Sequence, residues 1–346
     1  MRHEARHRRS RLVNTSRTRT PTQAAQAALD RPTLFSVLDA DEPLASETAS
    51  SDHRAAAHDE VSQAGGKQVP HDLQLPSLTP QLSTPLGCLY QADCLDLLPL
   101  FSSEIFDTVF ADPPFNLNKK YGSRTNDNHP EQEYTAWCKR WIEECVRLLA
   151  PGGAFFLYHL PRWNIELGSF LNDLGMSFRH WIAVEQNGRL PIPGRLYPSH
   201  YSLLYYTKGK PAVFRRIRTP IEICRHCGGE IKDYGGHRKA MNPNGVNLKD
   251  VWTDIPPVRH SKFKSSHRDA NSLSTKLLER VIEMSTEPGN AVLDPFGGSG
   301  TTYAVCENRD RRWVGIEIED VEAIRERLAG TIKPHVNDDY IEPCHA

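Results

Sequence analysis

The stretch Ala291–Thr302 reads AVLDPFGGSGTT and joins a strand, a turn and the start of a helix. Its first residues, AVL, are typical of a buried strand, which ends at Asp294. A glycine-rich turn follows, and Thr301 and Thr302 open a helix. Glycine lets the backbone approach a ligand closely, and the free N–H groups at a helix N-terminus favour a negative group. The stretch therefore predicts a strand–loop–helix unit that holds a ligand at the loop.

The spacing of the loop excludes two common nucleotide sites. A dinucleotide fingerprint needs a third glycine where Tyr303 stands, and a triphosphate-binding loop needs a lysine after the glycine. What remains is a Phe-x-Gly-x-Gly loop made of Phe296, Gly298 and Gly300. The next apolar run, WVGIEI, carries Glu317 near its end, where an acid can bridge two ribose hydroxyls. A tight strand–helix turn is the alternative, but strand, acid, loop, helix, strand and acid in this order favour a ligand site.

A second stretch, FADPPFNLNKKYG at residues 110–122, follows the strand-like run DTVFA. It places a carboxylate, Asp112, before Pro113, Pro114 and an aromatic ring, Phe115. Proline fixes φ and has no N–H, so the carbonyl positions are pre-set and no backbone donor competes there. The alternative is an ordinary Asp-Pro turn, and a similar cluster, TDIPP, occurs at residues 253–257.

With both motifs in one chain, the sequence resembles the S-adenosylmethionine-dependent DNA amino-methyltransferases that act on adenine N6 or cytosine N4. It is most similar to the permuted group, of β-type order, in which DPPF precedes the glycine loop. The resemblance covers about residues 86–330 and implies S-adenosyl-L-methionine as cofactor.

The segment NSLSTKLLERVIEMST at 271–286 resembles the family's helix before the cofactor loop, although Leu277 follows Lys276 where proline is commoner. The segment QAD resembles the family's GD element, with Ala92 in place of glycine before Asp93. The implied cofactor-binding residues are Asp93, Lys276, Asp294, Phe296, Gly298, Gly300, Thr301 and Glu317.

The resemblance also implies a role for each residue of the DPPF motif. The amino nitrogen of a base is a poor nucleophile, because its lone pair is delocalised into the ring. Asp112 would accept one N–H of that amino group and stabilise the developing positive charge, and the Pro113 carbonyl would accept the other N–H. Pro114 stiffens the turn, and Phe115 would stack on a base that has swung out of the duplex. Asp112 favours adenine N6, since relatives that methylate cytosine N4 more often carry serine at this position.

The predicted function is site-specific methylation of adenine N6 in double-stranded DNA. A cytosine-N4 enzyme on the same fold is the nearest alternative. A non-catalytic nucleic-acid-binding protein and a protein or RNA methyltransferase are more distant ones. A cognate restriction endonuclease is a candidate partner, and the chain is expected to be a monomer or a homodimer. A net charge of -1, no run of 18 apolar residues and eight cysteines without a disulfide spacing predict a cytoplasmic protein without a membrane span.

The alternation of strand and helix patterns predicts an α/β fold with a doubly wound and mostly parallel sheet. The predicted organisation is a disordered tail at 1–85, a catalytic half at 86–184, an inserted target-recognition region at 185–268, a cofactor-binding half at 269–330 and a C-terminal tail at 331–346. The Arg-rich first 20 residues are either part of a solvated tail or a nucleic-acid-binding arm.

Residues 185–268 contain 16 Lys or Arg and 6 Asp or Glu, a net charge of +10, which leaves -11 for the rest of the chain. Such concentration favours contact with phosphates, and a solvated basic face is the alternative. The same region contains Cys224, Cys227 and His237, which resemble half of a zinc site. The second half is missing from the sequence, so two reduced structural cysteines remain the alternative and a metal is left open.

Overall fold

The computed structural model describes most of the chain after residue 72. The described residues are 73–118, 127–186, 193–194, 196–224, 226–230, 235–236, 240–256, 272–330 and 339–341. The predictions for residues 1–72 and for His237 lie outside these ranges.

A nine-stranded sheet forms the centre of the described chain, in the order β1-β2-β11-β10-β3-β4-β6-β5-β9. Its strands are β1 Leu82–Ser83, β2 Gly87–Gln91, β3 Phe106–Ala111, β4 Leu149–His159, β5 Ser177–Glu185, β6 His200–Thr207, β9 Val251–Trp252, β10 Ala291–Asp294 and β11 Arg312–Glu317. Strands β2, β11, β10, β3 and β4 pair in parallel, and β1 and β6 run against their neighbours. The predicted α/β class with a mostly parallel sheet is confirmed.

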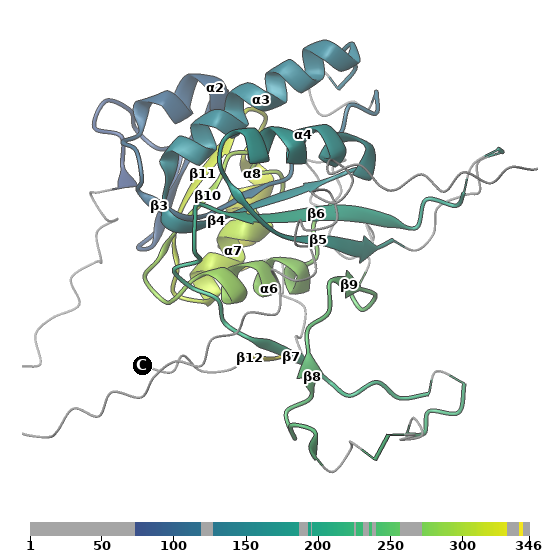
Figure 1. Cartoon of the computed structure of the whole chain (residues 1–346). Helices are drawn as coiled ribbons and strands as arrows, with labels where there is room; N and C mark the ends of the chain where they lie inside the picture. The colour runs from purple at the N-terminus through teal and green to yellow at the C-terminus, as the bar shows by residue number, and fades with distance from the viewer. Residues whose placement is uncertain are drawn as a thin grey trace, which may run out of the picture. The chain divides into compact units, whose positions relative to one another are not determined.

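Helices cover both faces of this sheet (Figure 1). One face carries α2 Cys94–Leu97, the 3₁₀ turn η3 Leu98–Leu100, α3 Glu131–Leu148 and α4 Pro161–Asp173. The other face carries α6 Thr275–Ser285, α7 Thr301–Asn308 and α8 Glu322–Leu328. Each group of helices shares a separate buried apolar cluster with one face of the sheet, as a doubly wound fold requires.

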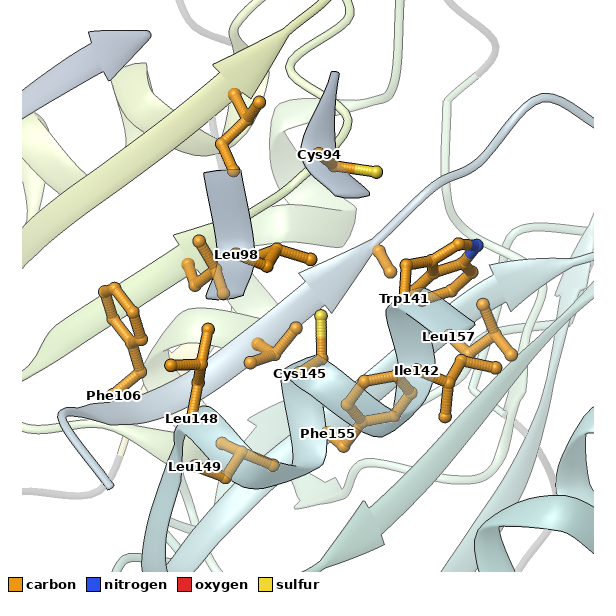
Figure 2. Close-up of a cluster of buried hydrophobic side chains, with 14 of the residues drawn as sticks. Cys94, Leu98, Phe106, Trp141, Ile142, Cys145, Leu148, Leu149, Phe155 and Leu157 are labelled. Carbon is orange, nitrogen blue, oxygen red and sulfur yellow. The ribbon is translucent and has the colours of Figure 1, made fainter. Parts of the chain in front are cut away.

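The apolar face of α3 explains why this helix lies on the sheet. Trp141, Cys145 and Leu148 recur at steps of four and three residues, and all three are fully buried. They share one buried cluster with Phe106 of β3 and Phe155 of β4 (Figure 2). Burial of each large apolar side chain contributes about 1.5–3 kcal/mol, so this seam fixes α3 against the two strands.

A second, three-stranded sheet joins segments that are distant in the sequence. It has the order β12-β7-β8, with β7 Ile217–Thr219, β8 Val246–Asn247 and β12 Tyr340–Ile341. Both pairings are antiparallel. The predicted C-terminal tail is therefore wrong for β12, which completes this sheet.

Two other predicted boundaries also need correction. Residues 73–85, assigned to a disordered tail, belong to the fold: Leu73 and Leu75 are buried, and the Leu75 N–H donates to the Tyr90 hydroxyl at 2.9 Å. The boundary between residues 184 and 185 would cut a hairpin, because β5 and β6 pair from one end to the other. The apolar run of β6 therefore belongs to the catalytic sheet rather than to a separate module.

Helix α6 is unusual because every one of its residues is buried, including four charged ones. All four charges are in ion pairs: Lys276 and Arg280 with Asp254 and Asp339, and Glu279 and Glu283 with arginines. Ion pairs of this kind offset the cost of removing the charges from water. No helix within the described ranges is long and apolar enough to cross a membrane.

Candidate active site at the switch point of the sheet

Strands β3 and β10 lie side by side at the point where the chain order of the sheet reverses. They pair in parallel, with Leu293 opposite Val109. From β3 the chain passes through α3 to β4 on one side, and from β10 it passes through α7 to β11 on the other. Because α3 and α7 cover opposite faces (Figure 1), the loops after β3 and β10 diverge, and ligands of open α/β sheets bind at such a point. The structure thus brings the two sequence motifs to one edge of the sheet.

The loop after β10 adopts the conformation that its glycines predict. Gly298 and Gly300 have φ angles of 57° and 75°, in the left-handed region that favours glycine. A Cβ atom on Gly300 would also lie 2.8 Å from the Ile324 side chain. Phe296 packs its ring against Trp141 of α3, with a centroid distance of 4.9 Å. The loop is therefore held between α3 and α8.

Glu317 and Asp93 lie beside this loop at the ends of two neighbouring strands. The Glu317 carboxylate accepts the Gly298 N–H at 2.6 Å. The backbone carbonyl of Glu317 accepts the Ala92 N–H at 3.0 Å, which places Asp93 next to it. Asp93 caps α2 by accepting the Leu95 N–H at 2.9 Å. The structure thus groups both acids with the glycine loop.

Asp294 is buried at the end of β10 and is held by two donors. The Thr302 hydroxyl donates to one carboxylate oxygen at 2.5 Å, and the Phe296 N–H donates to the other at 3.0 Å. Burial raises the pKa of Asp294 to about 7, opposed by these two hydrogen bonds and reinforced by the charge of Glu317. A carboxyl group with this pKa changes charge near neutral pH.

The start of α6 borders the loop through Leu273 and Ser274, next to the predicted residue Thr301. The Thr301 hydroxyl donates to the Leu273 carbonyl at 3.4 Å, and the neighbouring Ser274 is the N-cap residue of α6. The buried Ser274 hydroxyl has no hydrogen-bond partner among the described residues. Lys276, predicted to lie at the cofactor, has its ammonium 3.0 Å from the Asp254 carboxylate and thus takes part in the ion pairs of α6. Ser274 is a polar candidate that sequence reasoning missed.

The loop after β3 carries the DPPF motif. Asp112 and Pro114 are half-buried, and Pro113 and Phe115 are buried. The Phe115 ring lies among the rings of Tyr158, His159 and Tyr201, at centroid distances of 6.2, 4.8 and 5.4 Å respectively. The motif therefore has an aromatic wall beside its carboxylate.

Side chains from outside the motif hold this turn, and the sequence alone did not predict them. The Tyr134 hydroxyl donates to the Pro114 carbonyl, and the Trp163 indole N–H donates to the Phe115 carbonyl at 3.0 Å. The Asp127 carboxylate accepts the N–H groups of the two residues that follow Phe115, at 2.6 and 3.0 Å. The apolar periodicity of the helix predicts that the Tyr134 ring is buried, but it does not predict the hydrogen-bond partner of the hydroxyl.

The two cysteines of the CxxC segment lie in a tight turn. The Cys224 N–H donates to the Gly229 carbonyl at 2.7 Å, and the Gly228 N–H donates to the Cys224 carbonyl at 2.8 Å. Cys227 is exposed, and the backbone N–H groups of Cys227 and His226 lower the pKa of the Cys224 thiol. Among the described residues no group of three or more His, Cys, Asp or Glu could hold a metal ion. The metal question therefore stays open for this turn.

Known proteins share the sequence pattern. The type II methyltransferase M.BamHI of Bacillus amyloliquefaciens is 52% identical over 252 residues, which are 72% of this chain and 59% of that protein. M.HpaI of Haemophilus parainfluenzae is 32% identical over 230 residues, which are 64% of this chain and 68% of that protein. The matched region thus spans about three fifths of the first relative and two thirds of the second.

Among solved structures, the PvuII DNA methyltransferase (cytosine-N4-specific) matches with a TM-score of 0.53 and 22% identity, over 76% of this chain and 92% of that chain. At this identity the match supports the fold alone. The N6_N4_Mtase model, described as DNA methylase, matches residues 106–325, which include both loops at the switch point. The chain belongs to this DNA methylase family.

Proposed function

We propose that the protein transfers a methyl group from S-adenosyl-L-methionine to an exocyclic amino nitrogen of a base in double-stranded DNA. The observation that carries this proposal is the pairing of β3 with β10, which sets the DPPF turn and the glycine loop at one edge. Neither motif would suffice alone, because the reaction needs a cofactor site and a base site side by side.

The residues at the loop fit this cofactor. Two acids at the same edge, Asp93 and Glu317, suit the hydroxyl and amino groups of an adenosine, and the positive φ of Gly298 favours a residue without a side chain there. The Ser274 hydroxyl, which has no partner within the described residues, is a further polar atom beside the loop. When bound, S-adenosylmethionine supplies an electrophilic methyl group on a positively charged sulfur. Asp294 and Glu317 provide the negative charge that such a ligand favours.

The DPPF turn fits the base. Asp112 accepts one N–H of the target amino group, the Pro113 carbonyl accepts the other, and together they orient the nitrogen lone pair. The carboxylate stabilises the positive charge that develops on the nitrogen. Phe115 and the rings beside it offer an apolar wall for a base taken out of the stack.

We assign adenine N6 as the target on the basis of the aspartate at position 112. Cytosine N4 is the second candidate, since both bases present an amino group with two N–H bonds, and the fold neighbour named above is cytosine-N4-specific. Unmethylated DNA should be incubated with the protein and cofactor, digested to nucleosides and analysed by mass spectrometry. N6-methyladenine supports the first assignment and N4-methylcytosine the second. Absence of both, in a preparation that binds the cofactor, would contradict the proposed activity.

DNA contact is proposed for the basic region between β5 and α6. Its arginines differ in exposure: Arg215 is half-buried beside Glu283 and Glu287, with ion pairs at 2.7 and 3.9 Å, and Arg216 is exposed. The test is therefore Arg216→Glu, with DNA affinity measured against salt concentration. Loss of one phosphate contact should reduce the slope of log affinity against log salt by about one unit. An unchanged slope would place the DNA surface elsewhere. A cognate restriction endonuclease remains a candidate partner.

A further inference from the structure

The Pro114 carbonyl lies at one end of a chain of hydrogen bonds that reaches into the core. The Tyr134 hydroxyl of α3 donates to this carbonyl, and the same oxygen lies 2.7 Å from Nε2 of His159 at the end of β4. Nδ1 of His159 lies 2.8 Å from the Leu160 backbone N–H. Residues from α3 and β4 thus meet at the backbone of the DPPF turn.

The direction of each hydrogen bond follows from the Leu160 N–H. A backbone N–H can only donate, so Nδ1 of His159 is an acceptor and carries no proton. The proton of the neutral ring is then on Nε2, which donates to the Tyr134 oxygen. That oxygen has one proton of its own, which is directed at Pro114. The chain therefore has a single polarity, from Leu160 through His159 and Tyr134 to the motif.

The two side chains keep this state over a wide pH range. His159 is fully buried, and burial, aided by the charge of Arg162, lowers its pKa to about 3. Burial likewise raises the pKa of Tyr134 far above its usual value. Both groups stay neutral across the range in which enzymes are assayed, and the polarity of the chain does not reverse.

The imidazole of His159 also contacts the motif directly. Its ring stacks on Phe115, with centroids 4.8 Å apart and planes 25° from parallel. His159 thus contacts the Phe115 ring directly and, through Tyr134, holds the Pro114 carbonyl. Tyr206, another buried tyrosine, donates instead to the Gly168 carbonyl of α4. Burial alone therefore does not direct a tyrosine hydroxyl at the motif.

We propose that Tyr134 and His159 are positioning residues for the methyl transfer. They hold the Pro114 peptide and the Phe115 ring so that Asp112 and the carbonyl before Pro114 meet the target amino group at the correct angle. This inference rests on the proposed function. A displacement of about 1 Å in such a turn lowers the rate on the order of 10²-fold, because the reacting groups lose their alignment.

The central variant is Tyr134→Phe, which removes the hydroxyl and keeps the ring. Its matched control is Tyr206→Phe, an identical change at a second buried tyrosine whose hydroxyl donates to a backbone carbonyl. The measurements are the single-turnover rate of methyl transfer at saturating DNA, the KM for DNA and the cofactor Kd by calorimetry. Tyr134→Phe should lower the rate by about 10- to 100-fold with KM and Kd changed less than about threefold, and Tyr206→Phe should keep the rate.

Two variants of His159 separate its contacts. His159→Gln keeps an N–H donor for Tyr134 but loses the stacked ring, whereas His159→Phe keeps a ring against Phe115 but loses the donor. If the hydrogen-bond chain positions the motif, the glutamine variant should retain at least about tenfold more activity than the phenylalanine variant. The reverse ranking would overturn the role of the chain. These variants also supply the test where Tyr134→Phe does not fold.

The experiments distinguish failure of the positioning role from failure of the proposed methyl transfer. A wild-type protein that transfers no methyl group would contradict the function itself. A wild-type protein that is active, with Tyr134→Phe within twofold of its rate, would overturn only the positioning role. Equal losses in Tyr134→Phe and Tyr206→Phe would also overturn it, because they would indicate a general effect on the fold.

Discussion

Replacement of Asp294 by asparagine should change stability and cofactor affinity in opposite directions. The side chain is 3% exposed and its pKa in the fold is about 7, against 3.8 for the ordinary group. Between these values the folded protein binds more protons than the unfolded chain, so stability present at low pH is lost as the pH rises through 7. A difference of about three pKa units corresponds to about 4 kcal/mol of lost stability at pH 8, and to less than half of that at pH 5.

The Asp294→Asn variant cannot ionise and should escape this loss. The amide oxygen can still accept one hydrogen bond, and the Thr302 hydroxyl can turn to accept from the amide N–H. Weaker hydrogen bonds cost about 1 kcal/mol, so a net gain of about 3 kcal/mol is expected at pH 8. Thermal unfolding from pH 5 to pH 8 should show an advantage of the variant that grows with pH. An advantage that is equal at both ends would refute a raised pKa.

Cofactor affinity, in contrast to stability, should be lower in Asp294→Asn than in the wild type at high pH. If the positively charged ligand favours the ionised carboxyl, the wild-type affinity should rise about tenfold from pH 6 to pH 8, because a group of pKa about 7 must first lose its proton at pH 6. Asp294→Asn should bind more weakly at pH 8 and show no such rise. Titration of the ligand itself affects both proteins equally and cancels in their ratio. The reasoning fails if the two proteins share one pH profile, since the titrating group would then lie elsewhere.

Three further predictions concern the fold and the site. Glu317→Ala should weaken cofactor binding in calorimetry by about tenfold or more and should also lower Tm, because the Gly298 N–H loses its acceptor, whereas undiminished affinity would remove the carboxylate from the cofactor site. Gly315→Ala should lower Tm strongly, because the new Cβ would lie 2.3 Å from the Tyr303 ring, and an unchanged Tm would mean that the ring moves without cost. Deletion of residues 1–72 should leave Tm nearly unchanged, whereas deletion of residues 1–80 should cost about 2–5 kcal/mol through the loss of Leu73 and Leu75 from the core; equal Tm values would contradict their role.

The parts of the site that could be predicted from the sequence are local ones. Asp294, the glycine loop and Glu317 follow from strand patterns and turn chemistry within short stretches, and the structure places them together. The DPPF turn is local in the same sense, since its residue types alone predict a rigid turn after a strand. That its strand pairs with β10 could be expected only from the resemblance, because the two strands are far apart along the chain.

What the sequence could not supply depends on contacts between distant segments. Lys276 follows a helix pattern, but the position of its ammonium depends on Asp254, which comes from a segment outside that helix. Leu73 and Leu75 are two alternating leucines that a proline follows, and this pattern is too short to predict that they are buried. The hydroxyl of Tyr134 is invisible to an apolar pattern, because that pattern records only the ring.

The two loops of the site differ in the ionisation of their buried side chains, and this difference predicts which ligand releases a proton on binding. At the DPPF turn, the buried side chains of Tyr134 and His159 stay neutral. The cofactor loop instead holds Asp294, whose ionisation is opposed by burial and by the charge of Glu317. A cation that binds beside these carboxylates offsets both effects, whereas a neutral base at the DPPF turn offsets neither.

Binding of the cofactor should therefore release a proton near pH 7, measurable as a dependence of the calorimetric heat on the ionisation enthalpy of the buffer. Addition of DNA alone should release no proton from this carboxyl, and the Asp294→Asn variant should release none with the cofactor. Equal proton release by wild type and variant would show that the charge of the cofactor is balanced elsewhere.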